Sequence, residues 1–371
     1  MVEGMCEVGK IAIIGASVGQ LPICRKAKEM GLETHCFAYD QDAVCKEVVD
    51  FFHPISVLEK DAIVTECRRL GIQGVVSNAS DLTAEVVAYV SEKLGLTGAP
   101  YDNLLALRNK FHVRSLSSGI DGLTEIQYYI YNGEDKGLYP CVVKPVEGSS
   151  KKGVSFVSSR DDFAAAIQYA DCGKDIVVEE YIDGKELSIE SISYHGVHHI
   201  VQITDKDSSS APHFAELGHH QPAQLPDEIR TRIYEVIPQV LNKIGYPNGP
   251  SHIEMKYNKG KLYLIEANLR GGGDNISNIL VFLSSGVDYL RHMIEVAMGE
   301  FNGLKQVAKP AYSGIYYLCS QTAYILPLFE SSKGKEWLVD CQIYNTELTE
   351  SHSNYERDGY LIYKSNHKVL P

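Results

Sequence analysis

Short hydrophobic runs alternate with longer amphipathic stretches through the N-terminal part of the chain. The apolar runs predict buried strands, and the amphipathic stretches between them predict helices. Because a helix after each strand returns the chain to the same edge of a sheet, neighbouring strands run parallel. The pattern therefore predicts an open parallel sheet with crossover helices, with strands at 10–16, 34–39, 49–52 and 74–78 and helices up to residue 30, at 60–70 and at 82–94.

A glycine turn, from Gly15 to Gly19, follows the first predicted strand, and Asp40 ends the second. An acid at that place binds the ribose in dinucleotide folds. However, the second glycine of G-x-G-x-x-G, which lets the backbone approach a pyrophosphate, is replaced here by Ser17. The sequence therefore favours a scaffold domain that packs against the catalytic site over an NAD-binding domain.

A different pattern appears later, where two β-rich runs at 252–257 and 261–267 flank Asn258-Lys259-Gly260. This arrangement predicts a β-hairpin. A three-residue hairpin loop usually ends in a residue with positive φ, and Gly260 tolerates that conformation. The sequence therefore predicts a hairpin with a three-residue loop and one apolar face directed to a core.

The polar face of this hairpin carries candidate metal ligands. With a three-residue loop, Glu254 shares a face with Glu266 and Asn268. Diagonal neighbours on one face lie about 7–8 Å apart, so these oxygens can reach one hard cation or a close pair of cations. A two-residue turn would instead put Glu254 on the opposite face and remove the site. A surface hairpin with solvated acids is the alternative interpretation.

Directly after the hairpin come a cation and a run of small residues: Arg270, Gly271, Gly272 and Gly273. Their backbone N–H groups are candidate donors to an oxyanion. Carboxylates for Mg²⁺ followed by such donors suit phosphoryl or acyl transfer. We therefore expect catalytic roles for Arg270, Gly272 and Gly273.

Length and charge limit the functional classes. At 371 residues the chain is long enough for two or three domains with their own cores. The net charge of −13 and the lack of a basic run argue against a nucleic-acid partner. An anionic substrate stays possible, because a few lysines and a metal ion make a local positive pocket.

Hydropathy and cysteine spacing predict a cytoplasmic protein with no membrane partner. No segment approaches the roughly 20 apolar residues of a membrane span, and the N-terminal residues lack the apolar core of a signal peptide. The nine cysteines are scattered and form no C-x-x-C pair. Neither a structural zinc site nor a disulfide framework is therefore expected.

The middle of the chain predicts a mobile loop that follows a strand. After Gly98-Ala99-Pro100, a basic amphipathic helix is predicted over 101–118, and a strand over 141–145. The following loop, 146–154, is rich in glycine and serine, whose N–H and hydroxyl groups suit phosphates. It is not a Walker loop, because Gly153 is not followed by a lysine and a hydroxyl residue. We expect a mobile loop that can close over phosphates, and a plain hairpin turn is the alternative interpretation.

A further strand, 175–178, leads into two acids, Glu179 and Glu180. Acids at an apolar strand end can hold an adenine amine and ribose hydroxyls, while Ile182 offers its backbone. The alternative is a pair of solvated acids at a strand exit.

In chain order the sequence shows Asn109-Lys110, VVKP with a Gly/Ser loop, E-E-Y-I-x-G-x-E-x-S, I-E-M and E-A-N-L-R-G-G-G. Together these motifs resemble the ATP-grasp superfamily. The resemblance implies an α/β protein with an N-terminal open parallel preATP-grasp domain followed by an ATP-grasp fold of two α+β subdomains. The implied boundaries are 1–98 for the first domain, 99–185 for a small lid subdomain with a linker helix, and 186–371 for a large catalytic subdomain with a C-terminal sheet extension.

The resemblance also implies ATP as a substrate with Mg²⁺ or Mn²⁺, and two ions are expected. It assigns Lys110 and Lys144 to ATP phosphates and adenine-side atoms, and it assigns Ser149, Ser150 and Gly153 to the lid. The adenine hinge would be lined by Glu179, Glu180 and Ile182, and Glu186 would contact the ribose. The implied metal ligands are Glu254, Glu266 and Asn268.

The segment 202–223 narrows the resemblance to one group within the superfamily. Its lysine, phenylalanine, E-x-G-H and proline resemble the corresponding segment of L-amino acid ligases that form dipeptides. The match implies that Lys206 steadies the γ-phosphate. Glu216 and His219 would face the amino acid, or Glu216 would help to hold metal. Arg270 would hold the reacting carboxylate or acyl phosphate. The alternative for Glu216 and His219 is a pair on an exposed loop.

The implied activity is that of an ADP-forming acid–amino-acid ligase, in which an acyl phosphate is attacked by an amine, such as a second amino acid. Leu269 departs from the family pattern, because many members have proline there. Members are commonly dimers, so a homodimer is expected. Two alternatives stay open: a carboxylase or ligase of the purine-precursor type, and a non-catalytic ATP-binding homologue.

Overall fold

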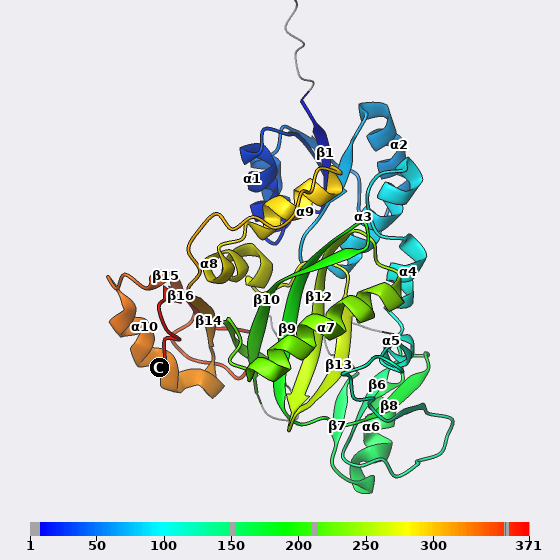
Figure 1. Ribbon diagram of the computed structural model, residues 1–371. Coiled ribbons are helices and arrows are strands. Elements are labelled where there is room, and N and C mark those ends of the chain that lie inside the picture. Colours follow the sequence, from blue (N-terminus) through cyan, green and yellow to red (C-terminus); the bar gives the residue numbers. More distant parts are fainter. Residues whose placement is uncertain (1–7, 148–152, 210–213, 352, 354–355, 371) are drawn as a thin grey trace, which may run out of the picture.

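The computed structural model describes residues 8–370 except 148–152, 210–213, 352 and 354–355. Within this part of the chain, three sheets carry the fold (Figure 1). No helix among the described residues is long and apolar enough to cross a membrane.

The N-terminal sheet has the strand order β3-β2-β1-β4, and every pair of neighbours is parallel, as predicted. Alternate residues of β1 enter two different cores because successive side chains of a strand point to opposite faces. Ile11 and Ile13 pack with α1 and α9, while Ala12 and Ile14 pack with α2 and α3. The elements are β1 (Lys10–Ile14), α1 (Leu21–Glu29), β2 (Glu33–Phe37), β3 (Phe51–His53), α2 (Lys60–Leu70), β4 (Gly74–Val76), α3 (Asp81–Leu94) and, from far along the chain, α9 (Tyr289–Ala297).

The basic helix predicted over 101–118 is two helices, α4 (Tyr101–Ala106) and α5 (Lys110–Leu116). The break occurs at Asn109, whose side-chain oxygen accepts a hydrogen bond from the N–H of His112 at 3.0 Å. A capping asparagine satisfies an N–H that the first turn of a helix leaves unpaired, so it starts a new helix there.

The small sheet has the order β5-β8-β6-β7 and is antiparallel. Helix α6 packs on it through Phe163, Ala166 and Ala170. The elements are β5 (Tyr128–Ile130), β6 (Cys141–Pro145), β7 (Ser155–Val157), α6 (Phe163–Ala170) and β8 (Ile176–Glu180).

The large sheet is antiparallel throughout, in the order β13-β12-β9-β10-β11-β14-β16-β15. Helix α7 covers one face (Figure 1), and α8 and α9 contact the same sheet elsewhere. The elements are β9 (Lys185–Tyr194), β10 (Val197–Ser208), β11 (Glu216–Gln221), α7 (Asp227–Ile244), β12 (Gly249–Asn258), β13 (Lys261–Asn268), a π-helix (Ile276–Leu280), α8 (Val281–Ser285), β14 (Tyr312–Leu318), α10 (Leu326–Ser332), β15 (Leu338–Ile343) and β16 (Gly359–Ser365).

The hairpin of β12 and β13 is present, but the predicted three-residue loop is wrong. Asn258 pairs with Lys261 across a two-residue turn in which Lys259 and Gly260 have φ of 47° and 82°. Positive φ at both central residues gives the turn a twist that matches a hairpin. The register then shifts between Met255 and Glu254.

This shift is a β-bulge at Ile265. Met255 pairs with Leu264, but Glu254 pairs with Glu266, so one extra residue lies on β13. A two-residue turn alone would have put Glu254 on the other face. The bulge brings Glu254 and Glu266 to the same face, because one added residue on β13 reverses the alternation of its side chains. Glu254 and Glu266 are therefore directly opposite each other rather than diagonal.

Candidate functional site

The facing carboxylates of Glu254 and Glu266 fit a divalent cation. In the described part of the chain, no hydrogen bond or ion pair to the Glu266 carboxylate is found, and its side chain is open to solvent. The surrounding protein atoms and the facing Glu254 raise the pKa of Glu266. A shared cation would relieve this repulsion. Asn268 lies two residues further on β13, on the same face. The three oxygen donors fit Mg²⁺ or Mn²⁺.

Lys206 on β10 lies between two carboxylates. Its Nζ is 2.8 Å from Glu216 Oε1 and 2.7 Å from Glu254 Oε1, and the side chain is buried. Burial disfavours the ammonium, but the two acids raise the pKa of Lys206 well above its usual range. Lys206 is therefore positively charged and compensates two carboxylates at once.

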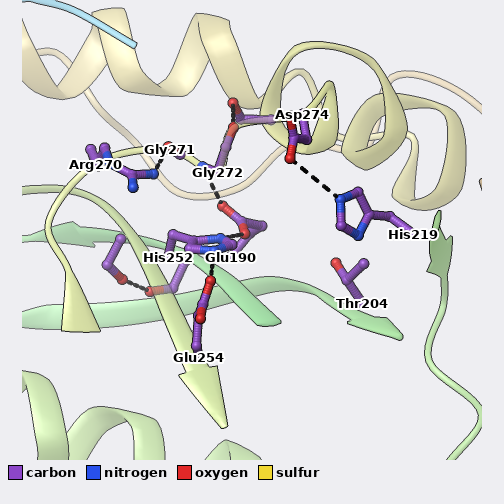
Figure 2. A network of polar contacts seen from close by, with 12 residues as sticks. Glu190, Thr204, His219, His252, Glu254, Arg270, Gly271, Gly272 and Asp274 are labelled. Atoms are coloured by element: carbon purple, nitrogen blue, oxygen red, sulfur yellow. Dashed lines mark hydrogen bonds and ion pairs between the residues drawn. The ribbon is translucent and has the colours of Figure 1, made fainter. Parts of the chain in front are cut away.

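Glu216 and His219 lie on β11 and are buried, so the alternative that placed them on an exposed loop is wrong. His219 Nε2 is 3.2 Å from Glu216 Oε2. The same nitrogen is 3.9 Å from Asp274 Oδ2 (Figure 2). Although burial lowers the pKa of an imidazole, Asp274 and Glu216 raise that of His219. The imidazole is thus held between two acids.

Glu216, His219 and Asp274 offer three ligand atoms within 4.8 Å of one another. Each acid, however, already has a cationic partner. Lys206 pairs with Glu216, and the Arg357 guanidinium is 2.9 Å and 3.0 Å from the two Asp274 oxygens. The charges of both acids in this cluster are therefore compensated by cationic side chains.

Arg357 comes from the segment between β15 and β16, and it lies over the ring of Tyr317 at 3.4 Å from the centroid. The Tyr317 hydroxyl in turn donates to the Asp274 carbonyl oxygen at 2.9 Å. The C-terminal strands therefore contribute a guanidinium to the same site as the hairpin.

A second buried network runs through His252, which Figure 2 shows between Glu190 and Glu254. His252 Nδ1 contacts Glu190, and Nε2 is 3.2 Å from Glu254 Oε1. The other Glu190 oxygen accepts the N–H of Gly272 at 3.0 Å. A Cβ at position 272 would lie 2.8 Å from both Glu190 and His252. The expectation that the Gly272 N–H faces an oxyanion is therefore wrong, because Glu190 already accepts it.

The charge on His252 predicts a pH dependence of stability. Although burial lowers the pKa of His252, Glu190 and Glu254 raise it to about 9, against about 6.5 in an unfolded chain. The stabilisation is therefore complete below about pH 6.5 and is lost as the pH rises through about 9. Over this interval the free energy of unfolding in urea should fall by on the order of 1–3 kcal/mol more in the wild type than in His252→Gln. An equal fall in both proteins would contradict the assignment of this charge.

Arg270 extends away from the hairpin towards the N-terminal domain. Its Nε contacts Asp81 at the start of α3, and the Asp81 carboxylate raises the pKa of Arg270 despite burial. A Cβ at Gly271 would lie 2.5 Å from Asn78, whereas a Cβ at Gly273 would meet no atom within 4 Å. Gly271 is thus needed for close packing between the domains, and Gly273 has open space beside it.

Leu269 stands where the family pattern often has proline. It is buried in the core that α7 makes with the large sheet. An apolar side chain at this position therefore anchors the segment before Arg270.

On the small subdomain, Glu179 is buried between two cations. Arg114 Nε lies 2.8 Å from one of its oxygens, and Lys144 Nζ lies 2.7 Å from the other. Burial favours the neutral acid, but these cations hold the pKa of Glu179 well below its usual range. The Glu179 carboxylate expected to hold an adenine amine is therefore engaged by Arg114 and Lys144. Glu180 points to the opposite face and accepts the N–H of Gln127 at 2.9 Å.

Residues predicted to contact adenine and ribose are linked by Lys256. Its Nζ donates to the Ile182 carbonyl at 3.0 Å and lies 3.2 Å from Glu186 Oε1. Lys110 is the first residue of α5, and its backbone N–H donates to Val146 at 2.8 Å. Desolvation lowers the pKa of the Lys110 side chain, although Glu266 and Glu179 counteract this effect. Lys110 therefore lies near both the hairpin and the small sheet.

The predicted lid falls largely outside the described residues, which exclude 148–152 and with them Ser149 and Ser150. Gly153 is described, and its φ of 75° together with the packing of Pro145 explains the absence of a side chain.

Comparisons with known proteins agree with this architecture. Residues 138–278 match the ATP-grasp domain family. This region, less than half of the chain, is similar to ATP-grasp domains. This confirms the resemblance predicted from the ordered motifs, and ATP-grasp enzymes generally use ATP with Mg²⁺ or Mn²⁺.

Two curated relatives of this chain are longer proteins. ATP-grasp enzyme fsqD of Aspergillus fumigatus is 26% identical over 308 residues, which are 70% of this chain and 52% of that protein. An uncharacterised protein of Sinorhizobium fredii, y4rH, is 28% identical over 258 residues, 65% of this chain and 52% of that protein. The chain thus spans about half the length of these relatives.

Solved structures share the whole architecture. The L-amino acid ligase from Bacillus licheniformis has a TM-score of 0.79 and 23% identity, covering 97% of this chain and 94% of that one. Phosphoribosylglycinamide synthetase from Anaerococcus prevotii has a TM-score of 0.76 and 15% identity, covering 97% and 95%. The predicted fold class is therefore confirmed.

Several charged residues of this site were not among those predicted from the sequence. His252 carries a signal in hindsight, because it shares the polar face of the hairpin with Glu254. Asp274 directly follows the glycine run that was singled out. Nothing in the pattern marks Arg357, because its segment joins the site only through the pairing of β14 with β16.

Proposed function

We propose that this chain is an ADP-forming carboxylate–amine ligase that joins an amino acid to an amine, such as a second amino acid. The observation that supports the proposal best is the density of opposite charges beside the hairpin. Glu216, Asp274 and Glu254 alternate with Lys206 and Arg357 at ion-pair distance. A zwitterionic amino acid presents both of the charges that such a set would bind.

Each residue has a place in this proposal. Glu254, Glu266 and Asn268 would hold Mg²⁺ or Mn²⁺, which when bound would offset the negative charge of the phosphates. Lys110 and Lys144 would contact ATP, and Arg270 would release Asp81 to bind the reacting carboxylate. Glu216 and His219 would face the amino acid.

The bonds balance in two steps. A carboxylate oxygen attacks the γ-phosphorus, and the bond to the β–γ bridging oxygen breaks, leaving ADP and an acyl phosphate. The amine nitrogen then attacks the acyl carbon, loses a proton and expels phosphate. In this proposal Lys206, Arg270 and the Gly273 N–H would stabilise these anions. The acyl phosphate hydrolyses if it meets water, so closure over the site is required.

Trapping the acyl phosphate tests the proposal. The protein is incubated with ATP, Mg²⁺, hydroxylamine and each amino acid in turn, and hydroxamate, ADP and AMP are measured. We expect hydroxamate and ADP only with a suitable amino acid, and a second amino acid should compete and give a peptide bond. The controls omit the amino acid or the hydroxylamine.

Three results would contradict the proposal. ADP release that depends on bicarbonate and a ribonucleotide, without any hydroxamate, would indicate a purine-precursor carboxylase. Formation of AMP would exclude attack at the γ-phosphate. ATP binding without turnover under every condition would indicate a non-catalytic homologue.

A further inference from the structure

The bulge at Ile265 has a dedicated partner on another helix. Arg114 of α5 donates from its two terminal nitrogens to the carbonyl oxygens of Leu264 and Ile265, each at 2.6 Å. Ile265 is the extra residue at the register shift, and Leu264 is the last residue paired before it. A bulge leaves backbone groups outside the regular ladder, β13 is also the edge strand of its sheet, and a buried carbonyl needs a donor. Arg114 supplies donors to two such carbonyls at once.

The arginine is itself held in place. Its side chain is 1% exposed, and its Nε pairs with Glu179 at 2.8 Å. A planar guanidinium held through Nε presents its other two nitrogens in a fixed geometry. Lysine has one ammonium and cannot reproduce this fork.

The bulge decides where the hairpin acids point. If β13 lost it, the two-residue turn would pair Glu254 with Ile265 and His252 with Ala267. Glu266 would then face the side of the sheet that packs against α7. The opposition of the two carboxylates depends on one extra residue, Ile265, whose carbonyl oxygen Arg114 binds together with that of Leu264.

We propose that Arg114 is a positioning residue that fixes the bulge at Ile265 and thereby brings Glu254 and Glu266 face to face. The role of this pair in metal binding rests on the proposed function. The register itself does not, so the two ideas can be tested separately.

Engineered disulfides report the register without any assay of activity. His252 and Asn268 are directly opposite beyond the bulge, and facing residues of antiparallel strands lie within disulfide range. In the slipped register His252 would instead face Ala267. The reporters are therefore H252C/N268C for the bulged register and H252C/A267C for the slipped one. A third pair, N258C/K261C, flanks the turn and is opposite in both registers, so it serves as the matched control.

Each reporter is placed in proteins with Arg114, Arg114→Met and Arg114→Lys, with the exposed Cys172 replaced by serine. Cross-linking by oxidised glutathione is followed by mass spectrometry of non-reduced peptides. We expect Arg114→Met to slow the H252C/N268C cross-link at least about tenfold, to accelerate H252C/A267C, and to leave N258C/K261C unchanged. Arg114→Lys should give an intermediate result, and it becomes the deciding variant if Arg114→Met does not fold.

The variant Glu179→Gln distinguishes the effect of the Arg114 contacts with the two carbonyls from the effect of the ion pair between Arg114 and Glu179. It removes the charge of the Nε partner but leaves both donors to the bulge, so the H252C/N268C rate should be retained. Unchanged cross-linking in folded Arg114 variants would overturn the proposal. An equal slowing in Glu179→Gln would also overturn it, because the ion pair would then be the cause.

Manganese titration in the presence of ADP tests whether the register of the hairpin affects metal binding. Arg114→Met should weaken Mn²⁺ binding about tenfold or more, while ADP binding in metal-free buffer changes less. If the reporters show the slip but neither Arg114→Met nor Glu266→Gln alters Mn²⁺ affinity, the positioning role stands and the metal role of the hairpin fails.

Discussion

Glu266→Gln is expected to lower kcat on the order of 10²–10³-fold, the size of loss found when one preorganised electrostatic contact is removed. The amide keeps the shape of the side chain but lacks the charge that would hold the metal ion while anionic groups meet. The fold should persist, because the raised pKa of Glu266 means that its ionisation disfavours the folded state. Turnover is measured as ADP release, and folding by thermal unfolding.

The matched control for Glu266→Gln is Glu228→Gln, the same change at an exposed acid on α7 that pairs with Arg232. Its kcat should equal that of the wild type. Near-normal turnover in a folded Glu266→Gln protein would remove the metal site from the hairpin.

Lys206→Met is expected to destabilise the protein by about 3–5 kcal/mol, the usual cost of leaving a buried acid without its partner. Lys206 is the common cation of Glu216, which is buried, and of Glu254, whose side chain is 24% exposed, so Glu216 would lose its compensating charge inside the protein. The free energy of unfolding is measured in urea at neutral pH. Since methionine has a similar length and no charge, packing contributes little to the difference.

The double variant Lys206→Met/Glu216→Gln tests the cause. Neutralising one of the two acids should restore part of the lost stability, so that the two substitutions are not additive. A loss below about 1 kcal/mol in Lys206→Met would show that solvent reaches these acids. Strict additivity would show that Lys206 and Glu216 do not interact.

The N-terminal sheet could be predicted because its signal is local. The strand at β1 and the amphipathic helices after it are encoded in neighbouring residues, and chain geometry then requires parallel pairing. The far face of that sheet could not be predicted, because α9 covers it from a distant part of the chain.

The hairpin acids were found through two errors that cancel. The predicted three-residue loop does not exist. A two-residue turn and a one-residue bulge together leave three residues unpaired, the same number as the predicted loop. Only the alternation of side chains decides which residues share a face, so Glu254 and Glu266 still meet. Ile265 carries no glycine or proline signal, and the contact with Arg114 that identifies the bulge spans 150 residues of sequence.

The sequence by itself determined which groups can do chemistry: the acids of the hairpin, the glycine run after Arg270, and the order of the ATP-grasp motifs. Tertiary structure alone decided which charges face each other. Asp81 reaches Arg270, Arg357 reaches Asp274, and Glu179 binds Arg114 and Lys144. The physical reason is that a buried charge must be compensated by whichever opposite charge the fold brings within a few ångströms, and separation along the chain places no limit on that partner.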